Sequence, residues 1–293
     1  MTVVAETAPS RARPPRRLAE ELRQWPITLK TGTGIIVTIV LAGIFAPWLT
    51  PYDPYNQDLT NALQAPGWEH PFGTDMFGRD IFARVLYGIR IDMQIGFFTT
   101  YVPMTYGVML GAMAGYYRRW FDAILMRVLD VAVAFPFLVL IIVIIAILGP
   151  GVHNIYVAVF LVAWAMYARL ARAEMLVERT KDYVLAARVL GFGSGRIVFL
   201  HALPNIISSS IVFSMSDFVL NILLVSGLSF LGLGVQPPEP EWGAMIAEGR
   251  DFILDAWWIC TLPGLVVVLT GTGLSLIGDG LARRLGHSRK SLM

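Results

Sequence analysis

Six apolar stretches, long enough or nearly long enough to cross a lipid bilayer, constrain this chain more than any other feature. The fourth is the shortest. They cover residues 32–49, 93–117, 131–148, 155–170, 206–231 and 259–281. A helix needs about 20 apolar residues to span the hydrocarbon core. With 56% hydrophobic and 15% charged residues, the chain is too apolar for an ordinary soluble protein. The sequence therefore predicts an all-α polytopic membrane protein with about six transmembrane helices.

Basic residues fall unevenly between these stretches. Of the 23 Lys and Arg residues, 19 precede the first stretch, lie between the second and third or the fourth and fifth, or follow the sixth. The other four lie in the remaining loops, at Arg79, Arg84, Arg90 and Arg250. Positively charged loops stay in the cytoplasm. We therefore expect both termini, and the loop between the fourth and fifth stretches, to be cytoplasmic.

The same pattern predicts how the chain is organised. Residues 1–30 form a basic, Arg- and Pro-rich segment that we expect to be a disordered cytoplasmic tail; contact with anionic lipid is the alternative. A transmembrane domain follows over residues 31–285, and residues 286–293 form a second cytoplasmic tail. The loops of the domain are predicted at 50–92 and 235–257 on the outer side and at 171–205 on the cytoplasmic side.

Several kinds of chemistry are missing from the sequence. No lysine follows a glycine, so no phosphate-binding Gly-Lys-Ser/Thr loop exists and the chain is not expected to hydrolyse ATP itself. The four histidines lack metal-ligand spacing. A single cysteine, Cys260, cannot form an internal disulfide. We predict no catalytic residues, no metal, no cofactor bound by this chain and no nucleic-acid partner.

Two spacing patterns mark helix faces within the apolar stretches. Glycines at positions 107, 111 and 115 share one face and predict a close contact between two helices. Four polar residues also share a face in the fifth stretch: Ser210, Ser214, Asp217 and Asn221. An acidic residue at the bilayer centre costs about 2.5 to 3.5 kcal/mol and indicates function. Asp217 either borders a water-filled translocation cavity or bonds to another span or subunit.

A polar segment interrupts the apolar pattern from Tyr183 to Asn205 and reads YVLAARVLGFGSGRIVFLHALPN. It resembles the EAA loop of ABC importer permeases, which has Glu-Ala-Ala, three residues, Gly, nine residues, a hydrophobic residue, any residue and Leu-Pro. Five residues match that spacing: Ala186, Ala187, Gly191, Leu203 and Pro204. Two depart from it, because Leu185 replaces the Glu and His201 stands where the general pattern has Ile.

The resemblance extends from about residue 53 to residue 285. The segment HPFGTDMFGRDIFARVLYGIRIDM, residues 70–93, resembles the HPLGTDxxGRDxxSRxxYGxRxSL segment of C-type permease subunits for dipeptides, oligopeptides and nickel. Residues 228–243, LSFLGLGVQPPEPEWG, match a second segment of that family. After the second stretch the family has GYYGGxxDxxxMRxxD, and here Arg118 and Arg119 replace its glycines.

This resemblance implies a type I ABC importer permease fold in a bacterial or archaeal cytoplasmic membrane. The chain would form half of a pore that a second, homologous permease completes as a heterodimer. Two cytoplasmic ABC ATPases would bind ATP, and an extracytoplasmic binding protein would deliver peptides or similar polar solutes such as nickel chelates and opines. The residues implied in ATPase coupling are Tyr183, Leu185, Ala186, Ala187, Gly191, His201, Leu203 and Pro204.

The first outer loop is a candidate surface for the binding protein, because a long charged segment is unnecessary merely to join two spans. A structural cap over the pore is the alternative. The candidate contact residues are Gly73, Thr74, Asp75, Gly78, Arg79 and Asp80.

Two other classes of function were weighed against the importer. A proton-coupled secondary transporter would use Asp217 as its proton site and would need no ATPase. A membrane enzyme has little support, because no nucleophile, base and orienting group come together in the sequence.

Overall fold

The structure, a computed structural model, describes residues 25–290, with side chains described through Arg284. Within that range it is built from helices joined by loops, and the only bridge of β type pairs Thr74 with Asp80. The long helices are α2 (Ile27–Ile44), α4 (Ile81–Tyr117), α5 (Arg119–Ala134), α6 (Phe137–Leu148), α7 (Val152–Glu178), α10 (Leu203–Phe230) and α12 (Trp258–Lys290). The short ones are α3 (Ala46–Leu49), α8 (Asp182–Val189), α9 (Ser194–Arg196) and α11 (Trp242–Gly249), with a π-helical turn over Ile197–Ala202.

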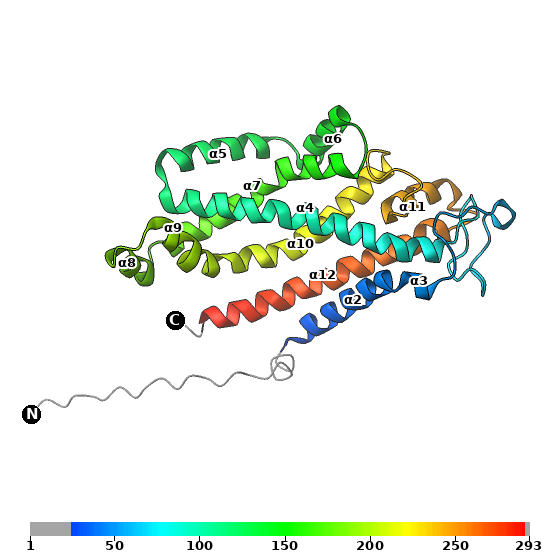
Figure 1. Ribbon diagram of the computed structural model, residues 1–293, viewed down its shortest axis with the longest axis horizontal. Helices are drawn as coiled ribbons and strands as arrows, with labels where there is room; N and C mark the ends of the chain where they lie inside the picture. The colour runs from blue at the N-terminus through cyan, green and yellow to red at the C-terminus, as the bar shows by residue number, and fades with distance from the viewer. Residues whose placement is uncertain (1–24, 291–293) are drawn as a thin grey trace, which may run out of the picture.

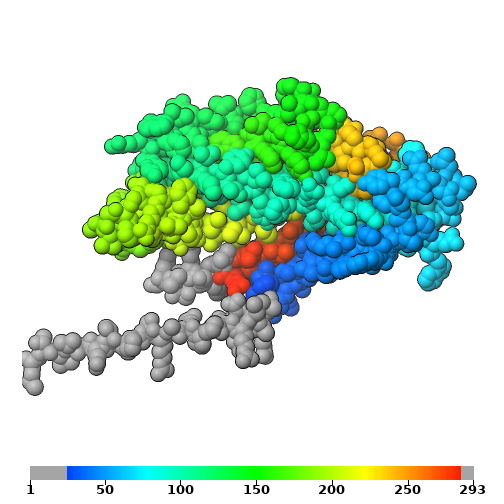
Figure 2. Space-filling view, in the orientation of Figure 1, coloured from blue at the N-terminus to red at the C-terminus, as the bar shows by residue number. Residues whose placement is uncertain are grey.

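The bundle is elongated and its two ends differ. Helices α4, α7 and α10 run side by side, and α12 with α2 lies along them (Figure 1). The turns that contain α8 and α9 lie at one end, whereas α3, α11 and the first outer loop lie at the other (Figure 1). Figure 2 shows the same separation on the surface, with the yellow-green α8 region far from the blue outer loop.

Close approach of α4 to α7 depends on three glycines. A Cβ added at Gly107 would lie 2.7 Å from the Trp164 carbonyl oxygen, one at Gly111 would lie 2.1 Å from that of Ala168, and one at Gly115 would lie 2.8 Å from that of Arg172. No side chain fits at such distances. The spacing of four residues therefore correctly predicted a helix contact.

Among the residues that the structure describes, four helices are long and apolar enough to cross a membrane: Ile27–Ile44, Val152–Glu178, Ser194–Phe230 and Trp258–Arg284. A fifth span results if α5 and α6 are counted together as one broken span. The second predicted stretch, 93–117, lies in α4, which does not meet the same standard of length and apolarity. Because α4 buries one side against α7, α10 and α2, its glycines, together with Thr99 and Thr100, face protein rather than lipid.

The third predicted span, 131–148, is wrong as a continuous helix. The chain bends by 87° between α5 and α6. Phe135 is extended, with φ −94° and ψ 143°, and Pro136 follows it. A residue before proline disfavours the helical conformation, and proline cannot donate to the preceding turn. Helix α6 has 12 residues, which is too short to cross a bilayer unaided.

The predicted tails differ in part from the structure. Helix α2 begins at Ile27, within the segment 1–30 that we expected to be a disordered tail. The rest of that tail up to residue 24, and residues 291–293, lie outside the described residues. Helix α12 continues to Lys290. The described part of the predicted cytoplasmic tail 286–293, residues 286–290, is therefore helical.

Candidate functional site

The segment from Tyr183 to Asn205 connects α7 to α10 at one end of the bundle (Figure 1). Helix α8 ends in a Schellman motif, in which the Phe192 N–H donates to the Ala187 carbonyl (3.1 Å) and the Gly191 N–H to that of Arg188 (3.0 Å). Gly191 has φ +80°, the conformation that glycine adopts without strain. This is the positive φ expected of the glycine in the EAA pattern.

One face of α8 anchors the segment to the bundle. Val184 and Ala187 are buried, and they belong to one cluster with Tyr116 and Met175. Ala187 is only 5% exposed, so it packs within the chain and is not available to a partner. Ala186, the other alanine of the pattern, is exposed. The two matched alanines therefore have different environments.

The opposite face of α8 presents apolar side chains to the outside. Val189 is 87% exposed, Leu190 is 73% exposed, and Leu185 is also exposed. Leu200, from the π-helical turn, adds a fourth large apolar side chain at this end. Within the described chain nothing covers this group, which we call the α8 apolar surface.

Tyr183 and the Leu-Pro end of the segment hold it to the neighbouring helices. The Tyr183 hydroxyl donates to Glu178 Oε1 (2.7 Å) and accepts from Asn205 Nδ2 (2.9 Å). Burial and Glu178 raise the pKa of Tyr183 to about 12, so its hydroxyl stays protonated at neutral pH. His201 lies against Phe192, with ring centroids 5.6 Å apart. Leu203 and Pro204 form the first turn of α10, where proline is tolerated.

A polar network inside the bundle contains Asp217. The Tyr167 hydroxyl on α7 donates to Asp217 Oδ2 (2.7 Å), and Asn221 Nδ2 donates to the same oxygen (3.2 Å). Asn221 also donates to Thr100 Oγ1 on α4 (3.0 Å). Asp217 thus joins α7, α10 and α4 within one subunit.

The other two members of the polar stripe are buried. Ser214 Oγ donates to the Ile211 carbonyl (2.8 Å). Ser210 Oγ has no hydrogen-bond partner among the described residues. The stripe therefore lies on one helix face as expected, but three of its four side chains are buried within this subunit.

An ion network closes the other end of the bundle. Asp75 Oδ2 pairs with Arg79 Nε (2.6 Å) and Arg84 Nη1 (3.4 Å), and Glu248 Oε2 on α11 pairs with the same two arginines at 2.8 and 3.2 Å. Both arginines are buried. Because each guanidinium contacts two carboxylates, the network fixes the outer loop to α11.

Asp80 begins α4. Its Oδ1 accepts from the Ala83 N–H (2.6 Å), a helix cap, and its Oδ2 lies 2.8 Å from His70 Nδ1. The Trp258 indole N–H donates to the Thr74 carbonyl (3.1 Å), and Gly73 and Gly78 have φ near +70°, at +73° and +72°. The loop is thus an ordered turn.

Burial corrects the expected role of this loop. All six candidate contact residues are buried: Gly73, Thr74, Asp75, Gly78, Arg79 and Asp80. Asp75 pairs with Arg79, Arg79 pairs with Glu248 on α11, and Asp80 pairs with His70. Because all six residues are buried, they cannot touch a soluble partner unless the loop unfolds. The most exposed large apolar side chains of the same loop are Trp68 and Leu59.

A buried pair of acids, Asp92 and Glu241, lies beside this loop, and no sequence pattern indicated it. Glu241 caps α11, accepting from the Gly243 N–H (2.8 Å) and the Ala244 N–H (2.7 Å). Asp92 precedes the apolar part of α4, and its Oδ2 accepts from the Trp242 N–H (3.2 Å). Burial, and then the charge of Glu241, hold the pKa of Asp92 well above its usual range. The related segment has Ser at the position of Asp92.

Within the part of the chain that the structure describes, no group of three His, Cys, Asp or Glu residues could hold a metal. The long apolar helices, the exposed α8 segment and the buried polar network define a polytopic membrane permease subunit. Comparison with known proteins gives the family. Residues 107–290 match the family described as binding-protein-dependent transport system inner membrane component, and residues 30–66 match the N-terminal transmembrane domain of oligopeptide transport permease C.

Several relatives align over most of the chain. The dipeptide transport system permease protein DppC of Alkalihalophilus pseudofirmus is 42% identical over 89% of this chain and 86% of the relative. The di/tripeptide permease protein DppC of Pseudomonas aeruginosa is 40% identical over 89% and 88%. The glutathione permease protein GsiD of Pectobacterium atrosepticum is 41% identical over 88% and 86%. The chain therefore belongs to the family of inner-membrane permease components of binding-protein-dependent transport, and its relatives are transport permeases rather than enzymes.

Proposed function

We propose that this permease forms half of the translocation pore of an ATP-driven importer of short peptides. ATP is bound and hydrolysed by two separate ATPase subunits, and a second, homologous permease completes the pore. The peptide class is supported by the relatives, which are named as permease proteins for dipeptides, di/tripeptides or glutathione. Those names favour peptides over the nickel chelates and opines of the wider resemblance.

The α8 apolar surface carries this proposal. Four large apolar side chains, Leu185, Val189, Leu190 and Leu200, are exposed beside a segment that has the EAA spacing. Fully burying a side chain of this size contributes about 1.5 to 3 kcal/mol, whereas an exposed ion pair contributes about 0 to 1 kcal/mol. Apolar burial on an ATPase can therefore replace the ion pair that a Glu at position 185 would make.

Orientation follows from charge. The α8 end carries Arg188 and Arg196, and the positive-inside tendency places it, with both chain termini, in the cytoplasm. The outer loop then faces a substrate-binding protein. We assign that contact to the exposed Leu59 and Trp68 rather than to the buried turn from Gly73 to Asp80.

Ala186→Arg tests the docking surface. The residue is exposed on α8, so the variant should insert and assemble normally while its charge prevents the ATPase from seating. Ala65→Arg is the matched control, because Ala65 is exposed in the outer loop at the other end of the bundle. We expect loss of ATPase copurification and of ATP-dependent peptide uptake into proteoliposomes for Ala186→Arg alone. Normal copurification of that variant would refute the docking assignment.

A proton-coupled transporter that uses Asp217 is the second candidate. The position of this acid in a polar network between the helices of the bundle is the observation that favours it. Uptake driven by a pH gradient in vesicles without ATP would support that mechanism and exclude the ATP-driven one. Uptake that requires ATP and the ATPases, with no gradient, would exclude the proton-coupled mechanism.

A further inference from the structure

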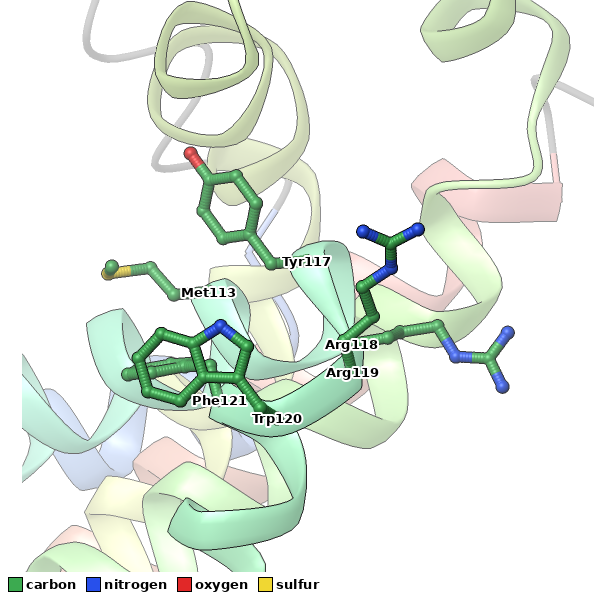
Figure 3. Close-up of a pocket in the computed structure, with 6 residues that line it drawn as sticks. All are labelled: Met113, Tyr117, Arg118, Arg119, Trp120 and Phe121. Atoms are coloured by element: carbon green, nitrogen blue, oxygen red, sulfur yellow. The ribbon is translucent and has the colours of Figure 1, made fainter.

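A pocket of about 470 Å³ lies where α4 ends and α5 begins. Its volume is within the range of about 300 to 1,000 Å³ that ligand sites occupy. Figure 3 shows the apolar and aromatic side chains on one side and two guanidinium groups reaching away on the other. The lining residues are Met113, Tyr117, Arg118, Arg119, Trp120 and Phe121.

The backbone that carries the two arginines is strained. Arg118 has φ +59° and Arg119 has φ +57°. Residues with a Cβ rarely adopt this conformation, which glycine tolerates without cost, and the related segment has glycines at both positions. Strain that persists at two consecutive positions indicates a function for the side chains that cause it.

The charges of these arginines are not neutralised by bonds within the subunit. Across residues 25–284, neither guanidinium forms a hydrogen bond or an ion pair that would satisfy it. Arg172 binds both carboxylate oxygens of Asp122, at 2.5 and 2.8 Å, so this acid of α5 does not pair with Arg118. The mouth of the pocket therefore carries positive charge.

The surroundings are those of a membrane interface. Trp120 is 71% exposed, and Tyr117 beside it is also exposed. Exposed aromatic rings next to arginines are enriched where the hydrocarbon core meets the headgroups. By its basic residues this turn lies on the cytoplasmic side, where anionic lipids are attracted to basic pockets between helices.

We propose that this pocket binds an anionic phospholipid. The guanidinium groups of Arg118 and Arg119 hold the lipid phosphate, which arginine recognises with paired N–H donors. Trp120, Phe121 and Met113 contact the glycerol and the first part of the acyl chains. Charge complementarity selects lipid over a neutral detergent, and the apolar wall selects lipid over free phosphate.

The test uses the purified permease complex in nanodiscs of phosphatidylcholine with increasing phosphatidylglycerol, with bound lipid counted by native mass spectrometry. Arg118→Gly/Arg119→Gly removes the charges and relieves the backbone strain, so loss of binding cannot be attributed to misfolding. Two charge-assisted contacts are lost, and we expect the apparent affinity for phosphatidylglycerol to fall at least about tenfold. Arg127→Gln is the control, since Arg127 is an exposed arginine on α5 outside the pocket.

Three results would overturn the proposal. One is unchanged phosphatidylglycerol binding by the double glycine variant. Another is an equal loss in Arg127→Gln, which would mean that any basic residue at this surface attracts lipid. The third is displacement of the lipid by millimolar inorganic phosphate, which would make the pocket a site for a soluble anion. Arg118→Lys/Arg119→Lys should retain part of the affinity, because it keeps charge but loses the paired donors.

Discussion

Tyr167 on α7 donates a hydrogen bond of 2.7 Å to Asp217 on α10, within the span that carries the polar stripe. Asn221 binds the same carboxylate oxygen and also reaches Thr100 on α4. The acid that the sequence marks for function is therefore bound directly from α7 and linked through Asn221 to α4, within its own subunit. Any role of Asp217 in transport must therefore be compatible with these hydrogen bonds.

Asp217→Asn should leave assembly with the partner permease intact and change the rate of transport. The amide keeps the shape and an acceptor for Tyr167 but loses the charge. The measurements are complex recovery on a detergent gel and peptide uptake. Tyr167→Phe is the companion variant: it removes one hydrogen bond to a charged group, worth about 1.5 to 3 kcal/mol, and should lower the melting temperature. Loss of the complex in Asp217→Asn would instead make the acid a structural link between subunits.

Asp75→Asn should destabilise the outer end of the subunit. Its carboxylate lies between the buried Arg79 and Arg84, and removing one partner of a buried ion pair costs about 3 to 5 kcal/mol. Asp251→Asn is the control, because its pair with Arg250 is exposed and worth about 0 to 1 kcal/mol. Thermal unfolding followed by tryptophan fluorescence compares the two. Equal melting temperatures would show that the network is not needed for stability.

The burial of Asp75 and Asp80 also bears on the expected contact between this loop and the binding protein. If this loop contacted the binding protein directly, charge reversal at Asp75 and Asp80 would weaken substrate-stimulated ATPase activity while basal activity survived. Since both acids are buried and bonded, reversal should reduce the amount of folded permease as well. Trp68→Ala, at an exposed residue of the same loop, is the variant expected to weaken stimulation while leaving basal ATPase activity and stability unchanged.

Stability should depend on pH through Asp92. Its pKa in the folded chain is raised well above 3.8, chiefly by burial and then by Glu241, the one titratable group that acts on it within the described chain. The folded state therefore retains a proton that the unfolded chain releases. The stabilisation is complete below about pH 4 and is lost as the pH rises towards the raised pKa.

Asp92→Asn should remove this dependence. The amide of Asn carries no charge beside Glu241 at any pH. As the pH rises from about 4, the parent chain should therefore lose stability relative to the variant. Melting temperatures across that range, in the same detergent, provide the comparison. Parallel curves for the two proteins would mean that Asp92 does not titrate in the folded state.

Gly191→Val should uncouple the α8 segment from the ATPase. The Schellman motif needs φ +80° at this position, and a left-handed conformation costs an L-residue about 1 to 2 kcal/mol. Gly193→Val is a close control, because both glycines have open space around them but Gly193 has φ −60°. Copurification of the ATPase should fall for the first variant only. An equal effect of the two would assign the loss to bulk rather than to backbone conformation.

Ala187→Arg is a poor probe of the same contact, because Ala187 is buried against the bundle. A charged side chain there should disturb the packing of α8 on α7 and lower stability. Its effect on coupling would then be indirect. Ala186→Arg avoids this difficulty because Ala186 is exposed.

The sequence by itself determined the properties that depend on local composition. Apolar runs placed α2, α7, α10 and α12, because a helix in lipid satisfies its own backbone and needs only length and apolarity. The spacing of Gly107, Gly111 and Gly115 predicted a helix contact, because residues four positions apart lie on the same face of a helix. The EAA spacing placed Gly191 at a helix end.

Only the tertiary structure decided which residues are buried and what they bind. The turn from Gly73 to Asp80 is charged, as exposed loops are, yet its Arg79 is buried and pairs with Glu248, 169 positions later in the sequence. Asp92 meets α11 at a separation of 150 residues. Local patterns carry no information about such partners, because a buried charge is stabilised by groups that folding alone brings within reach.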